Sequence, residues 1–393
     1  MKAGWIKTTL GDAFITSTGS TPPKSNSDFY GQFMPLVKPP ELCDSTLDSA
    51  EDGLSESGAQ VARTLPPNSI LVSCIGNLGK IGMNTVPVAF NQQINAIHPA
   101  PGKALPEFMF FQTLGGRFRE QLEAMASGTT VPIVNKSKFN SIEIVLPPLP
   151  EQQRIVTLLD EAFDGIATAK ANAEKNLQNA RAIFESHLQS VFTQRGDGWE
   201  DKTLEQISTT FGRGKSRHRP RNEPKLYGGK YPFIQTGDIR NAGHFITEYS
   251  QTYSELGLSQ SKLWPKGTIC ITIAANIAET GILGFDACFP DSVIGVVPNP
   301  NEAEVGFVEY LLQSFKVRIQ ALGQGSAQAN INMGTFENEH FPFPGVEEQR
   351  NIVAKLDDLS EETKRLESIY QQKLIALDEL KKSLLHRAFN GDL

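Results

Sequence analysis

The residues best suited to phosphate chemistry are Gly-Arg-Gly-Lys-Ser at 212–216, which resemble the end of a nucleotide-binding P-loop. The first glycine of that motif would fall at position 209, where the chain has Thr209, so the loop is incomplete. No Gly-x-Gly-x-x-Gly follows a predicted strand, which argues against a nicotinamide or S-adenosylmethionine pocket. We therefore predict no nucleotide cofactor in this chain.

Other catalytic patterns are also incomplete. Asn299-Pro300-Asn301 lacks the second proline and the aromatic ring with which amino-methyltransferases hold a flipped base. Glu379-Leu380-Lys381 could mimic part of a nuclease site, but it falls in a predicted helix with no aspartate placed before it. The histidines and cysteines show no metal-ligand spacing and no Cys-x-x-Cys. The sequence predicts neither catalysis nor a metal.

Residues suited to reading DNA are better represented. Asn, Gln and Arg can bond base edges in a major groove, and threonine methyls can meet thymine. Such residues cluster with glycine in turns, although turns of this kind also serve as plain scaffold. The candidate DNA contacts are Lys24, Asn77, Lys80, Thr129, Thr130, Arg213, Lys215, Arg217, Arg219, Arg221, Gln235, Thr236, Arg240, Gln328 and Asn330.

Positive charge is concentrated in one segment. Residues 212–225 carry six Lys or Arg against one Glu, whereas the matching stretch Gly19–Asp28 holds only Lys24. A loop with so many like charges suits phosphate neutralisation, which positions a protein on a duplex without reading its sequence. The net charge of −7 predicts weak DNA binding by the isolated chain.

The elements that position these residues occur twice along the chain. Gln152–Val156 is matched by Gln349–Val353 at a shift of 197, and Leu54–Gly82 is matched by Tyr253–Gly281 at a shift of 199. A period near 200 residues is too long for a solenoid repeat of about 20–50 residues. We infer one duplicated domain and expect pseudo-twofold symmetry, which suits a duplex target.

Length and composition agree with a two-domain protein. A chain of 393 residues exceeds the size of a single core of about 250–300 residues, and no apolar run reaches the length of a membrane helix. Met1–Leu10 has no signal-peptide core, so we expect a cytoplasmic protein. We expect α+β domains at residues 1–150 and 196–345. Each should contain one longer helix, over 106–126 and over 305–322. Short strands are expected around 34–37, 69–74, 141–146, 231–234, 268–273 and 293–297.

Residues 151–195 and 346–393 differ from these domains. Their apolar residues alternate at spacings of three and four, which predicts two helices of about 60 Å at 1.5 Å per residue. We expect an antiparallel coiled coil that separates the domains, although core helices on their own domains are the alternative. Proline-rich segments before each helix predict hinges. The helix residues assigned to the seam or to a partner are Glu151, Gln152, Ile155, Leu159, Asn176, Glu348, Gln349, Ile352, Leu356 and Lys373.

In this seam, positions such as Ala162, Ile166, Ala169, Ala173, Ala180, Ile183 and His187 match Leu359, Thr363, Leu366, Tyr370, Leu377, Leu380 and Leu384. Asn176 and Lys373 fall at the same repeat position and are expected to set the register of the coil.

The layout resembles the specificity (S) subunits of Type I restriction-modification enzymes. The resemblance covers essentially the whole chain and is carried by the two helix starts, 146–156 and 343–353, with 76–82, 232–239 and 325–332. The first half has Lys38-Pro39-Pro40-Glu41 where the second has Gln235-Thr236-Gly237-Asp238, which predicts a different loop. Gly345-Val346 replaces a proline–leucine pair at the second helix start.

The resemblance implies two pseudo-twofold-related α/β target recognition domains, separated by two long antiparallel helices, each domain reading one half of a bipartite asymmetric site in double-stranded DNA. It implies that the helices dock two methyltransferase (M) subunits that use S-adenosylmethionine, and that restriction (R) subunits use ATP and Mg. This chain would itself hold no cofactor. The alternatives are a stand-alone DNA methyltransferase or nuclease with its recognition module in cis, and a coiled-coil scaffold without nucleic acid.

Overall fold

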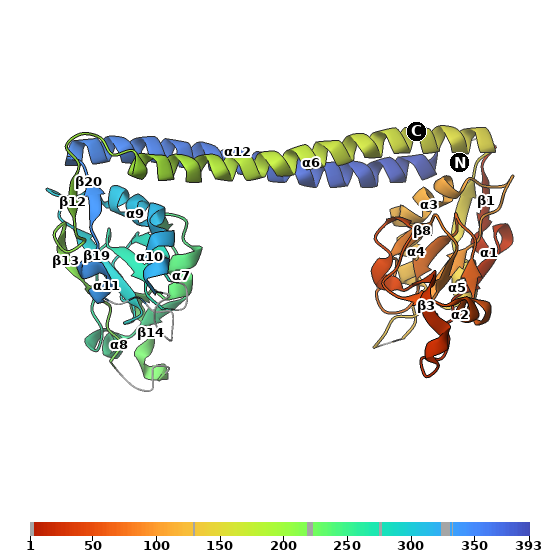
Figure 1. Ribbon diagram of the computed structural model, residues 1–393, viewed down its shortest axis with the longest axis horizontal. Helices are drawn as coiled ribbons and strands as arrows, with labels where there is room; N and C mark the ends of the chain where they lie inside the picture. The colour runs from red at the N-terminus through yellow and green to blue at the C-terminus, as the bar shows by residue number, and fades with distance from the viewer. Residues whose placement is uncertain (1–3, 129, 218–222, 275–276, 324–330, 332) are drawn as a thin grey trace. The chain divides into compact units, whose positions relative to one another are not determined.

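The computed structural model describes residues 4–128, 130–217, 223–274, 277–323, 331 and 333–393 (Figure 1). They form two compact units, of which unit 1 is Met1–Glu174 with Gln371–Leu393 and unit 2 is Lys175–Tyr370. Each unit holds one mixed domain, the beginning of one long helix and the end of the other. Within the described residues, no helix is both long and apolar enough to cross a membrane.

Unit 1 is built on a five-stranded sheet in the order β2-β10-β7-β8-β4. Its strands are β2 (Thr16–Thr18), β10 (Ile94–Ile97), β7 (Ile70–Ser73), β8 (Ile81–Asn84) and β4 (Ser45–Leu47). Smaller sheets join β1 (Ile6–Thr9) to β11 (Glu143–Leu146), and β5 (Gly53–Leu54), β3 (Tyr30–Val37), β9 (Val88–Phe90) and β6 (Thr64–Leu65). The helices are α1 (Leu10–Ala13), α2 (Glu56–Val61), α3 (Pro106–Leu114), α4 (Gly116–Ala124) and α5 (Lys136–Asn140), with 3-10 turns η1 (Ser27–Phe29) and η2 (Pro39–Glu41).

Unit 2 repeats this plan. Its main sheet, β13-β19-β17-β18-β15, consists of β13 (Ser208–Arg213), β19 (Val293–Pro298), β17 (Ile269–Thr272), β18 (Thr280–Leu283) and β15 (Phe245–Ile246). The other strands are β12 (Glu200–Lys202) with β20 (Phe341–Phe343), and β14 (Tyr227–Phe233) with β16 (Gln251–Tyr253). The helices are η3 (Pro224–Leu226), α7 (Thr236–Asn241), α8 (Glu255–Ser259), α9 (Val305–Ser314), α10 (Lys316–Gly323) and α11 (Met333–Glu337). The matching strand order confirms the duplication and the α+β class.

Alternating side chains divide each main sheet into two buried faces, as a strand sandwiched between layers requires. In unit 1, Val72 and Ile81 pack with Phe108 under the long helices, whereas Leu71 and Ala96 pack on the opposite face. Unit 2 shows the same division, with α9 on one face of the sheet and α7 on the other.

Each predicted domain helix is two helices. In unit 1 the break falls at Gly115, whose ψ of 146° is extended, and the Gly115–Gly116 pair carries a low helix propensity. In unit 2 the break falls at Phe315, whose ring packs edge-on against Phe341 at 5.5 Å. The glycine pair could have predicted the first break from the sequence, whereas the second break depends on tertiary packing.

Short helices begin at side-chain caps that recur in the two units. Ser55 and Ser254 accept a hydrogen bond from the backbone N–H three residues on, which starts α2 and α8. Asn135 caps α5 in the same way, through the Lys138 N–H at 2.9 Å. Its counterpart Asn332 lies outside the described residues.

The long helices are α6 (Leu149–Thr193) and α12 (Val346–Asn390). They run antiparallel in unit 1, where Arg154 donates to the Leu393 carbonyl while Lys170, further along α6, pairs with Asp378. In unit 2, Arg181 pairs with Glu367 at 3.0 Å. Two long antiparallel helices are therefore confirmed.

The buried seam departs from the predicted alternation in its middle. Asn176 and Lys373 are exposed and do not set the register, and the side chains of Ile183 and Leu380 are 52% and 46% exposed. The predicted Ala180 and Leu377 keep their places in the seam. At the exposed positions the next residue along the helix takes over, so that Leu177, Phe184 and Leu188 on α6, and Leu374 and Lys381 on α12, are buried or half-buried. A straight helix has 3.6 residues per turn and drifts about 20° per heptad from a 3.5-residue pattern, which explains the shift.

Three of the four cysteines are buried, and Cys43 is exposed. Burial raises the pKa of Cys74 to about 12 and also raises the pKa of Cys270 and Cys288. Because the thiolate is the reactive form, we expect one thiol per native chain to react rapidly with a disulfide reagent, and the others only after unfolding. Absorbance stopped-flow measures this, and a fast phase that survives Cys43→Ser would contradict it.

Candidate nucleic-acid interface

The predicted DNA contacts of unit 1 gather at one end of its main sheet, here called the loop end. β2 and β7 both finish there, opposite the start of β10, because Gly19 N–H donates to Ile94 and Cys74 N–H donates to Gln93. The segment containing Pro132 joins them through a bond from Gly76 N–H to the Pro132 carbonyl at 3.0 Å. The exposed Lys24, Asn77 and Thr130 and the half-buried Lys80 lie on these loops.

Backbone bonds fix the turn that carries Asn77. The Ser73 hydroxyl donates to the Asn77 carbonyl and accepts from the Lys80 N–H at 2.9 Å. Gly76 and Gly79 have φ angles of +77° and +73°, which other residues rarely adopt, so the glycines shape this turn. The side chain of Asn77 is exposed while its backbone is held. Thr129 lies outside the described residues.

Unit 2 has a corresponding loop end. Gly214 N–H donates to Val293 and Ile273 N–H donates to Ser292, which places the ends of β13 and β17 beside the start of β19. Arg213 donates through Nε to the Asp291 carbonyl at 2.8 Å. Lys215 and Arg217 follow as exposed side chains. The predicted contacts Arg219, Arg221, Gln328 and Asn330 lie outside the described residues.

Gln235, Thr236 and Arg240 occupy a different element. They belong to the start and the last turn of α7, whose Ile239 packs on the sheet face away from α9. The Gln235 amide donates to Gln251 at 2.7 Å, so that side chain is already engaged. The structure therefore groups these residues with α7 rather than with the loop containing Lys215.

The difference predicted between Lys38–Glu41 and Gln235–Asp238 is smaller than expected. Both segments form the same turn, in which the backbone N–H of the first residue donates to the carboxylate three residues on, at 3.0 Å and 2.8 Å. The two segments differ in the helix that begins at this turn, because η2 has three residues and α7 has six. The local motif is shared because either Glu or Asp can accept from the N-cap N–H.

Two buried glutamines hold the starts of the long helices. Gln152 accepts from Leu105 N–H at 2.9 Å and donates to the carbonyls of Pro147 and Lys103 at 2.8 and 3.2 Å. Gln349 makes the same set of bonds at the start of α12, to Glu304 N–H and to the carbonyls of Pro344 and Glu302. The proline-rich segments are therefore fixed corners, where the sequence predicted hinges.

The other residues assigned to a partner are engaged inside their own unit. Ile155, Leu159 and Leu356 are buried, and Ile352 is half-buried. Glu151 forms an ion pair with Arg154, and Glu348 accepts from the Trp199 indole N–H at 3.1 Å. A partner protein would therefore meet the exposed sides of α6 and α12.

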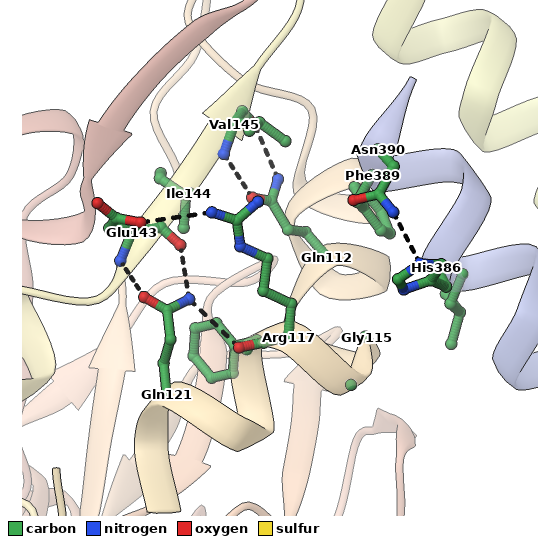
Figure 2. A pocket seen from close by; sticks show the side chains of 13 residues that line it. Gln112, Gly115, Arg117, Gln121, Glu143, Ile144, Val145, His386, Phe389 and Asn390 are labelled. Carbon is green, nitrogen blue, oxygen red and sulfur yellow. Dashed lines mark hydrogen bonds and ion pairs between the residues drawn. The ribbon is translucent and has the colours of Figure 1, made fainter. Parts of the chain in front are cut away.

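A pocket in unit 1 lies between α4, β11 and the last turns of α12 (Figure 2). Its polar groups bond one another, since Gln121 bonds the Glu143 backbone and Arg117 lies 3.4 Å from the Glu143 carboxylate. The His386 ring bonds Asn390 at 2.8 Å. These bonds stabilise the packing of α4, β11 and α12, and none of them pairs a nucleophile with a general base.

The two units differ in the buried polar group that α3 and α9 carry at one matched position. In unit 1, the Gln112 amide bonds both the N–H and the carbonyl of Val145. The matching strand residue in unit 2 is Pro342, which has no N–H, and Glu309 replaces the glutamine. Glu309 instead accepts from Thr280 and Gln313 and lies 2.6 Å from His244 Nδ1. Sequence reasoning missed this network because its partners are far apart in the chain.

Comparison with known proteins agrees with the duplicated architecture. A family model described as "Type I restriction modification DNA specificity domain" matches residues 2–178 and again residues 196–374. The chain belongs to this family and contains its domain twice. It is thus a DNA-specificity protein of the Type I restriction-modification class, and the matches give no support to a stand-alone methyltransferase or nuclease.

Individual relatives are similar over different lengths. The MjaIX specificity subunit of Methanocaldococcus jannaschii is 21% identical over 413 residues, covering 99% of this chain and 93% of that protein. The HindI specificity subunit of Haemophilus influenzae is 36% identical over 148 residues, which is 37% of this chain and 32% of that protein.

Two solved structures share the fold. A chain from a type I R-M system has a TM-score of 0.82 at 20% identity, covering 100% of this chain and 99% of its own length. The HsdS subunit from Thermoanaerobacter tengcongensis has a TM-score of 0.69 at 19% identity, covering 100% and 98%.

Proposed function

We propose that each domain of this chain reads one half of a bipartite, asymmetric site in double-stranded DNA. The observation that carries the proposal is that two sheets of the same strand order present different side chains at the same end. Directly after the equivalent glycines Gly19 and Gly214, unit 1 has Ser20 and Pro22 where unit 2 has Lys215 and Arg217. Equal scaffolds with unequal loops suit two half-sites of different sequence.

In this proposal α6 and α12 set the distance between the half-sites and dock two methyltransferase (M) subunits, which carry S-adenosylmethionine. Restriction (R) subunits complete the complex and use ATP and Mg. The exposed sides of the two helices support such docking, because their inner sides already form the seam. The complex acts in the cytoplasm, and the net charge of −7 leaves part of the phosphate contact to the partners.

The direct test is to map N6-methyladenine in the DNA of cells that carry this chain and its neighbouring methyltransferase subunit. We expect the two proteins to copurify and a bipartite methylated motif to disappear when this chain is deleted. Methylation that persists unchanged, with no complex formed, would refute the specificity role.

The basic segment of unit 2 gives a more local prediction. Replacing Arg217, Arg219 and Arg221 with alanine removes three cations from this segment. Each lost phosphate contact should lower the magnitude of the salt slope of binding by about 0.9. Affinity of the full complex should fall for cognate and unrelated DNA alike, measured by fluorescence anisotropy across a salt series. The control variant, in which the same three arginines are replaced with lysine, should keep the salt slope of binding. An unchanged salt slope in the alanine variant would exclude this loop from the DNA interface.

A further inference from the structure

In both units, another segment bonds the loop end: residue 63 in unit 1 and residues 260–262 in unit 2. In unit 1, Arg63 N–H donates to the Ser20 hydroxyl at 2.9 Å. In unit 2, the Ser261 hydroxyl donates to the Lys215 carbonyl at 2.8 Å, and Gln260 accepts from Arg217 N–H at 2.6 Å. Both segments therefore bond the loop that follows the first strand of the main sheet.

The two segments are equivalent in the duplicated fold. Leu65 pairs antiparallel with Val88 two residues after Arg63, and Trp264 bridges antiparallel to Ala287 two residues after Lys262. These partners precede the starts of β10 and β19 at the loop end. Arg63 and Lys262 thus occupy matching places, separated by the shift of 199 that relates this part of the two halves.

Each matching place carries a cation that no described carboxylate neutralises. The Arg63 side chain is exposed and donates to the Thr18 carbonyl, which neutralises no charge. Lys262 Nζ lies 3.6 Å from the centre of the Trp264 ring. Across the part of the chain that the structure describes, neither side chain forms an ion pair. The guanidinium keeps further N–H donors for a ligand, and the ammonium has three.

The surroundings of Lys262 disfavour its charge when no anion is bound. Partial burial and the neighbouring Lys215 both lower the pKa of Lys262. Ser261 and Gln260, which directly precede Lys262, bond the backbones of Lys215 and Arg217, and these bonds bring the two segments together. A bound anion would relieve the repulsion between the lysines and restore the lost solvation.

We propose that Arg63 and Lys262 are paired phosphate contacts, one on each half-site of the DNA. This inference rests on the proposed DNA-reading function and names residues that it did not include. Base-reading side chains should differ between two domains that read different sequences. A cation retained at the same place suits the feature that all DNA sequences share, which is the phosphate backbone.

The test compares the single variants Arg63→Gln and Lys262→Gln in the complex with its methyltransferase subunits. Each variant should lower the magnitude of the salt slope by about 0.9 and weaken binding to cognate and unrelated DNA by the same factor. Phosphate-ethylation interference should lose one position in one half-site for Arg63→Gln and one position in the other half-site for Lys262→Gln.

Controls separate charge from folding. Arg63→Lys and Lys262→Arg keep the charge and should keep the slope. Lys103→Gln and Lys266→Gln remove exposed lysines outside the loop-end segments and should leave the slope unchanged. An unchanged slope in both test variants, or interference lost from the same half-site in both, would overturn the inference. A wild-type complex that protects no bipartite site would instead refute the proposed function.

Discussion

Replacing Phe389 with alanine should destabilise unit 1 by about 3–5 kcal/mol, the usual cost of removing a buried phenylalanine. Phe389 is 8% exposed at the end of α12, and its ring meets Phe108 edge-on at 5.3 Å. Domains are stable by only about 5–15 kcal/mol, so much of unit 1 should lose its protection. Hydrogen exchange followed by mass spectrometry measures this unit by unit.

The same contact occurs in unit 2. Phe192 lies in the last turn of α6, is 2% exposed, and its ring centre lies 5.3 Å from that of Phe307. We therefore expect Phe192→Ala to remove protection from unit 2 instead. The exposed apolar residues Leu380 and Ile183 on the same helices provide matched controls. Their alanine variants should change stability little. A Leu380→Ala variant as unstable as Phe389→Ala would show that the seam follows the strict heptad after all.

Replacing Gln152 with leucine should cost unit 1 about 3 kcal/mol or more. The change leaves the Leu105 N–H and the Pro147 and Lys103 carbonyls without their partner, and each buried unsatisfied group costs about 1–3 kcal/mol. Gln349→Leu should have the same effect on unit 2. Urea unfolding compares these variants with Gln153→Leu, whose side chain is exposed and which should remain near wild type.

A glutamate at the same position tests the hydrogen bonds themselves. In Gln152→Glu the ionised carboxylate still accepts from Leu105 but faces two carbonyl oxygens. This environment should raise the pKa of the new glutamate above its unfolded value near 4.3. Its charge therefore destabilises unit 1 at neutral pH, and stability relative to wild type should recover as pH falls through the raised pKa. A penalty independent of pH would point to packing instead.

Much of the fold was readable because the chain contains it twice. The six predicted strands correspond to β3, β7, β11, β14, β17 and β19, whereas the other strands of the main sheets were not predicted. The helices α6 and α12 begin and end within a few residues of the predicted bounds. The seam was wrong in its middle because a 3.5-residue pattern drifts from a straight helix over several heptads. The break at Phe315 was missed because its cause, Phe341, is distant in sequence.

The candidate interface was less readable for the same reason. Lys215 and Arg217 stood out because like charges cluster in one loop. Arg63 and Lys262 belong to no motif, and only the hydrogen bonds from their segments to the loop end show their position. Gln152 was noticed as a repeated residue, but its role depends on carbonyls some fifty positions away.

The exchange of helix ends between the units also affects how the chain must fold during synthesis. The core of unit 1 includes Leu385 and Phe389, which are made more than about 220 residues after Phe163, the last earlier residue that packs in that core. At about 5–20 residues per second, the ribosome needs on the order of ten to forty seconds to cover that distance. The first domain therefore waits for the second to be translated, and during that interval its incomplete core is open to chaperones and proteases. A ribosome that stalls within unit 2 would leave a nascent chain whose first domain lacks Leu385 and Phe389 in its core.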